Sequence, residues 1–461
     1  MTENRKIRRV SYLIINRPFW FSLLLVLGVV FSCARQDFDL PDLEYSGGFS
    51  SHEIYNRVQP DIMLSDSCGA NDIFIGEDGT VFVAETALNR IGVYDIMGLP
   101  LMDYGLGSLL VDSVISVAVD RMMNLLAVNG SSQLFYWNQL LHTVPVDSVH
   151  YDFVLRDTTQ VDSLLPVDLI ELGEYLFVDE SDHFVLDSYQ RATTAAEVEE
   201  MLAMQVYETS QNTNLIDVSP DPDQPYQFFA TDNARNRIFQ FHFAPVGVAY
   251  SDDVLLPELL LWRIVPEATH HVVEFGTGFG YANKPNRIHV DADGDFYFSN
   301  FSDTGSDFQL HKTLRVEQGD GSFAYYPDNL FLFDDQTGDI RDLFDTLRFE
   351  DCWDMTTSSN NIFVVDRGYK YSIPMGKSEN AIARAGAVQV FSSGGEFITY
   401  AGAEIQFTED GEVYEFGELI DPVSVDYFGG EEVEEDINAL LFVLDRGSDR
   451  IVRYERTLPA D

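Results

Sequence analysis

Short apolar segments alternate with acidic, glycine-containing turns along most of the chain. In the clearest example, the apolar segment 73–75 leads into Asp78-Gly79, and a second apolar segment, 81–84, follows and stops at an acidic residue. An Asp-Gly pair suits the positive φ angles of a tight hairpin. After a polar turn, apolar residues alternate from Ile91 onward, which is typical of a strand with one buried face. The unit predicts three consecutive antiparallel strands.

The same unit recurs along the sequence, and such recurrence indicates a repeat architecture. Parts of it return at 228–241, 286–298, 361–368 and 441–454, with weaker copies at 115–137 and 169–186. The predicted first strands start near Ile73, Ile115, Leu169, Ile216, Ile288, Trp353 and Val423. A four-stranded blade of a β-propeller needs about 40–50 residues, and the shortest of these spacings reaches that length.

The repeat predicts an all-β fold, a β-propeller of four-stranded blades. Seven first strands favour seven blades over six, and the longer intervals must contain insertions. The segment 193–202 has an N-cap threonine, good helix formers and acids in its first turns, which predicts a short helix. The polar, glycine-containing segment 301–328 predicts a loop. Both insertions are expected to project from one face of the disc, where recognition usually takes place.

The last copy of the unit ends after its third strand, at 453–455. A closed propeller cannot leave the edge of that blade unpaired, because an open edge promotes aggregation. The segment 45–63 is the natural donor of the missing outer strand. We therefore predict that this segment joins the first and last blades.

The order of the unit (a strand, Asp-Gly, a second strand ending at an acid, then a strand opened by Asn-Arg-Ile) resembles the NHL-repeat family of β-propellers. The resemblance covers residues 45–461 and implies a propeller, for which six blades are common in the family. Related six-bladed enzymes, such as lactonases and amidating lyases, use a metal on the propeller axis with acid, Asn or His ligands. That ligand set does not map onto this chain residue by residue.

The N-terminus has the features of a signal peptide. Basic residues precede the apolar run 18–31, which at about 14 residues is too short for a bilayer span of about 20. Ser32-Cys33 follows and resembles a bacterial lipoprotein box, in which the Cys33 thiol is acylated (palmitate) and becomes the mature N-terminus. Ordinary cleavage with a free cysteine and an uncleaved anchor are the alternatives. Ala34 after the lipid site favours the outer membrane of the cell envelope. The predicted organisation is a signal peptide at 1–33, an acidic tether at 34–44 and a single propeller domain at 45–461.

Acidic residues far outnumber basic ones. The chain has 76 Asp and Glu against 28 Lys and Arg, and its net charge is −48. Such a surface repels nucleic acid and anionic membranes, so DNA and RNA are disfavoured as partners. An acid-rich, lysine-poor composition is typical of halophilic bacteria, where salt screens the self-repulsion. A surface that binds calcium is the alternative.

Several copies of the unit carry an acid at the end of the second strand. These acids are Glu85, Asp179, Asp232, Asp366 and Asp445. Propeller symmetry would place them in a ring at one face, and such a ring suits calcium, which takes six to eight oxygen ligands. The favoured alternative is structural: each acid accepts local backbone N–H groups, or pairs with the arginine of Asn-Arg-Ile. The matching arginines are Arg90, Arg237 and Arg450.

The remaining histidines, aromatics and cysteines give weaker signals. His270-His271 would point to opposite faces of a strand, so the pair does not suit one metal ion. The loop 276–281 lacks the following helix that a phosphate cradle requires, and its Phe279 and Tyr281 are instead candidate anchors for a bound partner. Cys68 and Cys352 each precede a predicted innermost strand, which leaves open either a disulfide near the axis or two buried free thiols.

These features favour a binding or scaffold module over an enzyme. The predicted anchor and the inserted loops suit a tethered propeller that binds a protein, peptide or glycan of the cell envelope. The sequence contains no Gly-x-Ser-x-Gly elbow, His-Glu-x-x-His motif or Walker-type loop. The alternative is an exported hydrolase or lyase of the six-bladed propeller type that uses a divalent metal on the axis, with calcium as the candidate ion.

Overall fold

The computed structural model places the described residues in one unit of the chain, within 51–461. The described residues are 54–457 apart from 103–106, 122–123, 139–151, 157–188, 193–203, 225–226, 252–253, 265–269, 302–307, 320, 335, 347, 369–385, 409–410, 416–417 and 430–438. Among these residues no helix is long and apolar enough to cross a membrane.

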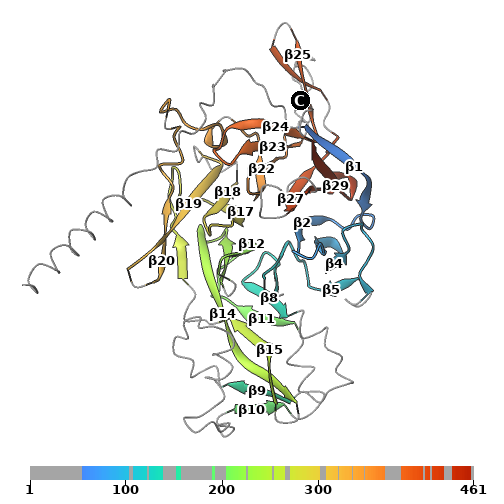
Figure 1. Cartoon of the computed structure of the whole chain (residues 1–461), viewed down its shortest axis with the longest axis vertical. Coiled ribbons are helices and arrows are strands. Elements are labelled where there is room, and N and C mark those ends of the chain that lie inside the picture. Colours follow the sequence, from blue (N-terminus) through green and yellow to red (C-terminus); the bar gives the residue numbers. More distant parts are fainter. Residues whose placement is uncertain are drawn as a thin grey trace, which may run out of the picture. The chain divides into compact units, whose positions relative to one another are not determined.

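Antiparallel four-stranded sheets build the described part of the chain, and each is one blade of a propeller (Figure 1). Blade 1 contains β2 (Ala70–Ile75), β3 (Val81–Glu85), β4 (Arg90–Tyr94) and β5 (Ser108–Leu110). Blade 2 contains β6 (Ser116–Val119), β7 (Asn124–Val128), β8 (Gln133–Asn138) and β11 (Gln205–Glu208). Blade 3 contains β12 (Leu215–Pro220), β13 (Gln227–Asp232), β14 (Arg237–Ser251) and β16 (His270–Val273).

The second half of the chain supplies three more blades, of which the last is completed by the first strand of the unit. Blade 4 contains β17 (Pro285–Val290), β18 (Phe296–Asn300), β19 (Leu310–Glu317) and β20 (Phe323–Pro327). Blade 5 contains β21 (Cys352–Thr357), β22 (Asn361–Asp366), β23 (Ala387–Ser392) and β24 (Phe397–Ala401). Blade 6 contains β27 (Pro422–Phe428), β28 (Leu440–Asp445), β29 (Arg450–Thr457) and β1 (Ile54–Met63).

Additional strands lie outside this plan. β14 continues past blade 3 and pairs there with β9 (Asp152–Arg156) and β15 (Val254–Ile264), and β9 pairs in turn with β10 (Tyr189–Ala192). β25 (Glu404–Thr408) and β26 (Gly411–Glu415) form a separate hairpin between blades 5 and 6 in the sequence.

The six inner strands form a closed ring. β2 lies beside β6, and the ring continues through β12, β17, β21 and β27 back to β2. The prediction of seven blades is therefore wrong, and the described chain forms six. The error has a specific cause: the fourth strand of blade 2, β11, comes after a long insertion, so the interval from 115 to 216 holds one blade. The extra predicted start, Leu169, lies outside the described residues.

The predicted insertions also need correction. The described residues contain no α-helix and only short 3-10 turns, η1 (Thr86–Leu88), η7 (Asp342–Phe344) and η9 (Arg446–Ser448). The helix predicted at 193–202 lies outside the described residues. The segment 301–328, for which the sequence predicts a loop, contains β19 and β20. Their polar composition reflects an outer position, where cross-strand neighbours such as Leu314 and Tyr326 remain partly exposed.

The turns of the unit form as local chemistry predicts. Gly79 and the equivalent Gly294 adopt positive φ angles of 80° and 78° in the hairpins that join first and second strands. The asparagine of Asn-Arg-Ile has the left-handed conformation at Asn89 (φ 53°) and Asn236 (φ 56°), a conformation that asparagine tolerates better than most residues. These positions explain why the repeat preserves glycine and asparagine at the two turns.

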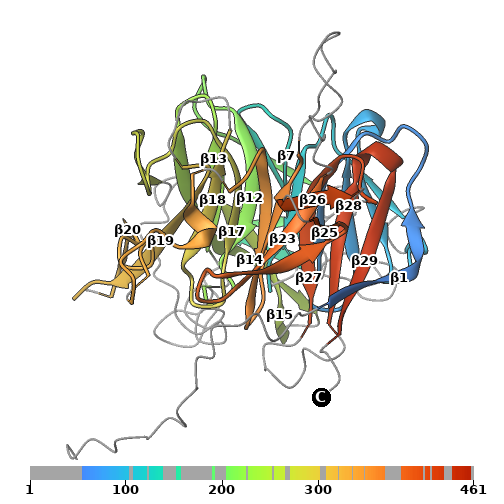
Figure 2. The same ribbon diagram turned by 90° about the horizontal axis from the view of Figure 1, so that it is seen from above.

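The ring closes through the predicted strand. β1 pairs antiparallel with β29, from Ile54 opposite Thr457 to Met63 opposite Arg450. Tyr55 and Ile62 of β1 are buried, in the clusters toward blade 5 and blade 1 respectively. The prediction that 45–63 supplies the outer strand of the last blade is confirmed for the part of that segment within the described residues. Figure 2 shows β1 beside β29 at the edge of blade 6.

Apolar side chains fill each space between neighbouring blades. The cluster between blades 2 and 3, for example, contains Phe228 and Phe241 with ring centroids 5.1 Å apart, together with Leu126 and Leu134. Burying one such side chain is worth about 1.5–3 kcal/mol. Because every blade covers the apolar face of the next, the ring holds together without a central hydrophobic core, and the axis is free to carry polar residues.

Candidate functional site

The acids that end the second strands are held by local hydrogen bonds. Glu85 pairs with Arg90 and accepts the hydroxyl of Tyr94 (2.9 Å). Asp445 accepts the N–H groups of Ile420 (3.0 Å) and Asp421 (2.9 Å), and its other oxygen is 3.2 Å from Arg450.

The acids of blades 3 and 5 accept backbone N–H groups. Asp232 accepts the N–H of Asn214 (2.9 Å), and Asp366 accepts those of Asp351 and Gly368 (both 3.1 Å). Asp179 lies outside the described residues. Within the described part of the chain, no group of three or more His, Cys, Asp or Glu side chains is arranged to hold a metal ion. The described acids of this set therefore take part in local hydrogen bonds, and the calcium ring, which also includes Asp179, stays a prediction.

The two candidate aromatic anchors have different surroundings. Phe279 is buried in the cluster between blades 4 and 5, with its ring 4.8 Å from that of Phe344 and 5.6 Å from that of Phe308. Tyr281 is 44% exposed. Only Tyr281 of the two therefore presents a surface on which a partner can rest, whereas Phe279 holds the loop to the core.

Cys68 and Cys352 are free and buried. Burial raises the pKa of the Cys68 thiol to about 11, and burial also raises the pKa of the Cys352 thiol. Of the two alternatives left open by the sequence, the structure has unpaired thiols, and both are in the unreactive protonated form at neutral pH.

Polar side chains repeat at one position of the six inner strands. The residues at this position are Asp72, Ser116, Asp217, Arg287, Asp354 and Ser424. In five of the six strands the pairing with the second strand is irregular at or next to this position. Such a bulge bends the strand and redirects a side chain. In these five strands the ladder is irregular at or immediately before the polar residue, which faces the neighbouring blades across the axis.

These polar residues join neighbouring blades to one another. His289 and Asp426, each two positions further along its strand, do the same. At every interface, a side chain of one inner strand accepts a backbone N–H of the next. The six bonds are Val117 N–H to Asp72 (3.0 Å), Val218 N–H to Ser116 (3.3 Å), Ile288 N–H to Asp217 (2.7 Å), Thr357 N–H to His289 (3.2 Å), Val425 N–H to Asp354 (3.0 Å) and Ile75 N–H to Asp426 (2.6 Å). Each bond contributes about 1 kcal/mol, so together they form a ring of bonds around the axis.

Arg287 is the basic residue among these axial polar side chains. It is 3% exposed, and its guanidinium lies 3.0 Å from Asp217 and 3.4 Å from Asp72, and donates to the backbone carbonyl of Asn71 (2.6 Å). The nearby carboxylates, Asp354 included, raise the pKa of Arg287 further above its ordinary value, so it remains charged. One guanidinium thus faces three carboxylates of three different blades.

Burial moves the pKa values of three axial carboxyl groups, those of Asp217, Asp354 and Asp426, toward neutral pH. Burial raises the pKa of Asp217 and that of Asp354 to about 7, although the charge of Arg287 acts in the opposite direction on both. Burial likewise raises the pKa of Asp426 to about 7, and its hydrogen bonds from Ile75 and Tyr427 oppose the rise. The low-dielectric axis therefore contains carboxyl groups whose negative charge is costly.

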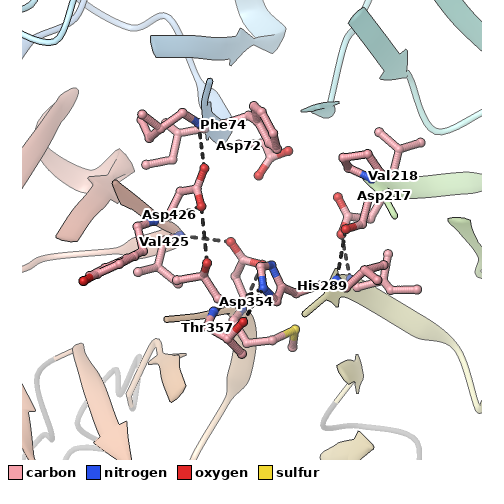
Figure 3. Close-up of a pocket in the computed structure, with 18 of the residues that line it drawn as sticks. Asp72, Phe74, Asp217, Val218, His289, Asp354, Thr357, Val425 and Asp426 are labelled. Atoms are coloured by element: carbon pink, nitrogen blue, oxygen red, sulfur yellow. Dashed lines mark hydrogen bonds between the residues drawn. The ribbon is translucent and has the colours of Figure 1, made fainter. Parts of the chain in front are cut away.

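A cavity of about 200 Å³ lies on the axis beside these polar side chains. Figure 3 shows Asp217 on one side of it and Asp354 and Asp426 on the other. Apolar parts of Phe74, Met355, Val425 and other inner-strand residues complete the wall. A second cavity of about 260 Å³ shares Phe74, Ile75, Pro220 and Pro222 with the first and extends to the β2–β3 turn.

His289 is the histidine of this wall. Its Nε2 accepts the backbone N–H of Thr357 (3.2 Å) and lies 2.8 Å from the Thr357 hydroxyl. Burial lowers the pKa of His289 to about 4, so the ring is neutral at neutral pH with its proton on Nδ1. The lone pair that a general base would use is occupied by a bond between blades 4 and 5.

Replacing Asp426 by asparagine tests the electrostatics of the axis. The folded-state pKa of Asp426 lies above its ordinary value, so its carboxyl favours folding below about pH 4, and this contribution is lost as pH rises through about 7. The asparagine side chain would keep an oxygen for the Ile75 N–H without acquiring charge. We expect the substitution to raise the free energy of unfolding at pH 8 by about 1–3 kcal/mol and to change it little at pH 4. Urea unfolding at both pH values measures this, and an equal effect at both would contradict it.

Sequence reasoning missed Arg287 and the axial acids, although a signal was present. Aligned on their apolar residues, the first strands each carry a polar residue immediately before Ile73, Val117, Val218, Ile288, Met355 and Val425. A polar residue that recurs in an otherwise apolar inner strand indicates an axial position.

No family model and no curated protein matches the chain. Among solved structures, it is similar to a streptogramin B lyase (10% identity, TM-score 0.36, covering 88% of this chain and 98% of that one). It is also similar to a putative gluconolactonase (10% identity, TM-score 0.37, 88% and 93%) and to a protein of unknown function from Bacteroides thetaiotaomicron (9% identity, TM-score 0.39, 88% and 72%). Similarity at this level does not indicate a function, so the function must be inferred from the residues of this chain.

Proposed function

We propose that this chain is an exported, lipid-anchored propeller that acts as a binding or scaffold module for a protein, peptide or glycan of the cell envelope. One observation carries the proposal: the polar side chains around the axial cavity are held in fixed positions by bonds between blades. Asp217, Asp354, Asp426 and His289 each accept a backbone N–H of the neighbouring blade. Groups held in this way suit the recognition of a ligand better than proton transfer or metal binding.

The sequence supports the envelope location. The segment 1–33 has the composition of a lipoprotein signal peptide, and the 76 acidic residues disfavour anionic membranes and nucleic acid as partners. A single acyl chain gives only marginal anchoring, so more than one acyl group at Cys33 is required for stable attachment. The NHL-like arrangement of the repeat, which the sequence suggests, is part of this proposal.

The anchor is tested by substituting Cys33 with serine in the full chain. We expect the variant to lose incorporation of labelled palmitate and to leave the outer-membrane fraction, while the propeller still folds. Fractionation and label incorporation measure both effects, and Cys68→Ser is the matched cysteine control. A Cys33→Ser variant that retained the label would contradict the lipid anchor.

Binding is tested against catalysis with the purified chain. We expect saturable binding to a component of an envelope extract, and unchanged binding after treatment with a chelator. We also expect no turnover of a panel of lactones, esters and peptides in calcium or magnesium. A stoichiometric divalent ion whose removal abolishes turnover of one of these substrates would overturn the proposal in favour of a hydrolase or lyase.

A further inference from the structure

The axial cavity is lined by more carboxyl groups than form ion pairs with basic side chains of the described residues. Asp72, Asp217, Asp354 and Asp426 all line it. Arg287 forms ion pairs with Asp72 and Asp217. In the described part of the chain, neither Asp354 nor Asp426 forms an ion pair with a basic side chain. A buried carboxylate without a cation is costly, and a cationic ligand would supply the missing partner.

Asp354 and Asp426 can still bind a cationic ligand in addition to their present hydrogen bonds. Asp354 uses one oxygen for the N–H of Val425 (3.0 Å) and the other for its neighbour Met355 (2.9 Å). Asp426 accepts Ile75 N–H (2.6 Å) with one oxygen, and Tyr427 N–H (2.8 Å) and the Thr356 hydroxyl (3.3 Å) with the other. A carboxylate has about four acceptor sites, so each can still accept a donor from the cavity while its present bonds fix its direction.

The rest of the wall and the size of the cavity limit what the ligand can be. Phe74, Met355 and Val425 offer apolar surface beside the two carboxylates. At about 30 Å³ for each water-sized group, 200 Å³ holds roughly six or seven such groups. This space suits a short aliphatic stem with a small charged head, and it is too small for a whole peptide or an oligosaccharide.

The cavity that adjoins the axial one is also lined mainly by acidic residues among its charged side chains. The adjoining cavity, which shares four lining residues with the axial one, is also lined by Glu77, Asp78, Asp120 and Asp221, with Arg121 as its basic residue. Acidic surroundings raise the local concentration of cations. The whole chain, with a net charge of −48, acts in the same direction.

We propose that the axial cavity binds a primary ammonium group on an aliphatic stem of lysine length, with Asp354 and Asp426 as its counter-charges. The inference rests on the proposed binding function and specifies it: the partner presents a lysine side chain, or an equivalent amine, to the axis. A primary ammonium has three donors on one small atom and fits between two carboxylates more readily than a planar guanidinium.

The test uses Nα-acetyl-lysine methylamide as the probe and calorimetry or NMR titration of the full propeller at pH 8. The norleucine compound has a similar stem without charge, and the Nε-acetyl-lysine compound keeps the length but not the ammonium. We expect the lysine compound to bind saturably, and both neutral compounds to bind at least tenfold more weakly. Equal binding of the norleucine compound, or no binding of the lysine compound, would overturn the proposal.

The site is located with two matched substitutions. Asp426→Asn is expected to weaken binding of the lysine compound at least tenfold, and the exposed Asp66→Asn, which removes the same charge elsewhere, is expected to leave it unchanged. Unfolding curves of both variants establish that they fold. Equal weakening by the two substitutions would show a general charge effect and overturn the axial site. Capture of an envelope partner that the lysine compound does not displace would leave the binding function standing and refute the axial amine site.

Discussion

Replacing Arg287 by leucine is expected to lower the free energy of unfolding at pH 8 by about 3–5 kcal/mol. The guanidinium is 3% exposed and lies within 3.4 Å of both Asp72 and Asp217. Its removal would leave three axial carboxyl groups, Asp354 included, facing one another without a cation. Urea unfolding of the variant and the parent measures the loss.

The pH dependence separates this electrostatic effect from lost packing. Burial and the neighbouring acids already raise the pKa values of Asp217 and Asp354 to about 7, against the charge of Arg287. Without Arg287 these pKa values should rise further, so the variant should regain part of its stability at pH 5, where the carboxyl groups hold protons. An equal loss at pH 5 and pH 8 would contradict the electrostatic cause.

Two further variants test whether the loss comes from the axial charges. Arg121→Leu removes an exposed arginine whose partner, Glu77, is also exposed, and it should change stability by less than about 1 kcal/mol. Adding Asp217→Asn to Arg287→Leu should recover part of the loss, because it removes one of the uncompensated charges. A loss below about 1 kcal/mol for Arg287→Leu alone would show that the axial ion pairs contribute little to folding.

The local features of the fold could be predicted because they depend on neighbouring residues only. The Asp-Gly turn requires a positive φ at Gly79, and the turn before Arg90 requires one at Asn89. Both requirements are visible in the sequence itself. The missing outer strand was also predictable, because a blade that stops after its third strand must find a fourth elsewhere in the chain.

The blade count could not be read in the same way. Blade 2 receives its fourth strand, β11, after the insertion that follows β8. No local pattern distinguishes a distant fourth strand from the start of another blade, so a weak apolar run near Leu169 resembles one. The outer strands β19 and β20 were missed for a related reason: outer strands are partly exposed, and their polar composition resembles that of a loop.

The axial site was missed because the motif Asn-Arg-Ile occurs in two structural contexts. In Asn89-Arg90 the arginine begins a third strand and pairs with the acid of its own blade, Glu85. In Asn286-Arg287 the arginine lies on an inner strand and pairs with acids of other blades. The residues of the motif are the same in both places. Only the strand on which the motif lies decides whether the arginine pairs with an acid of its own blade or with the axial acids of other blades.

Deleting β1 is the second change with a large expected effect. A chain that begins at residue 64 should lose at least about 3 kcal/mol of unfolding free energy relative to a chain that begins at residue 54. The estimate follows from the burial of Tyr55 and Ile62, each worth about 1.5–3 kcal/mol. The deletion also removes Arg57, which pairs with Glu418 (2.5 Å), and Asp61, which lies 3.1 Å from Arg450.

Removal of β1 should also promote aggregation, because it exposes the edge of β29. Without β1 its outer edge presents unpaired N–H and C=O groups, and such an edge pairs with other chains. We therefore expect the shortened chain to aggregate at concentrations where the longer chain elutes as a defined species in size-exclusion chromatography. A synthetic peptide of residues 51–66, added in excess, should restore both elution and stability by supplying the strand in trans. If the shortened chain melts at the temperature of the longer one and the peptide has no effect, the pairing of β1 with β29 does not hold the ring closed.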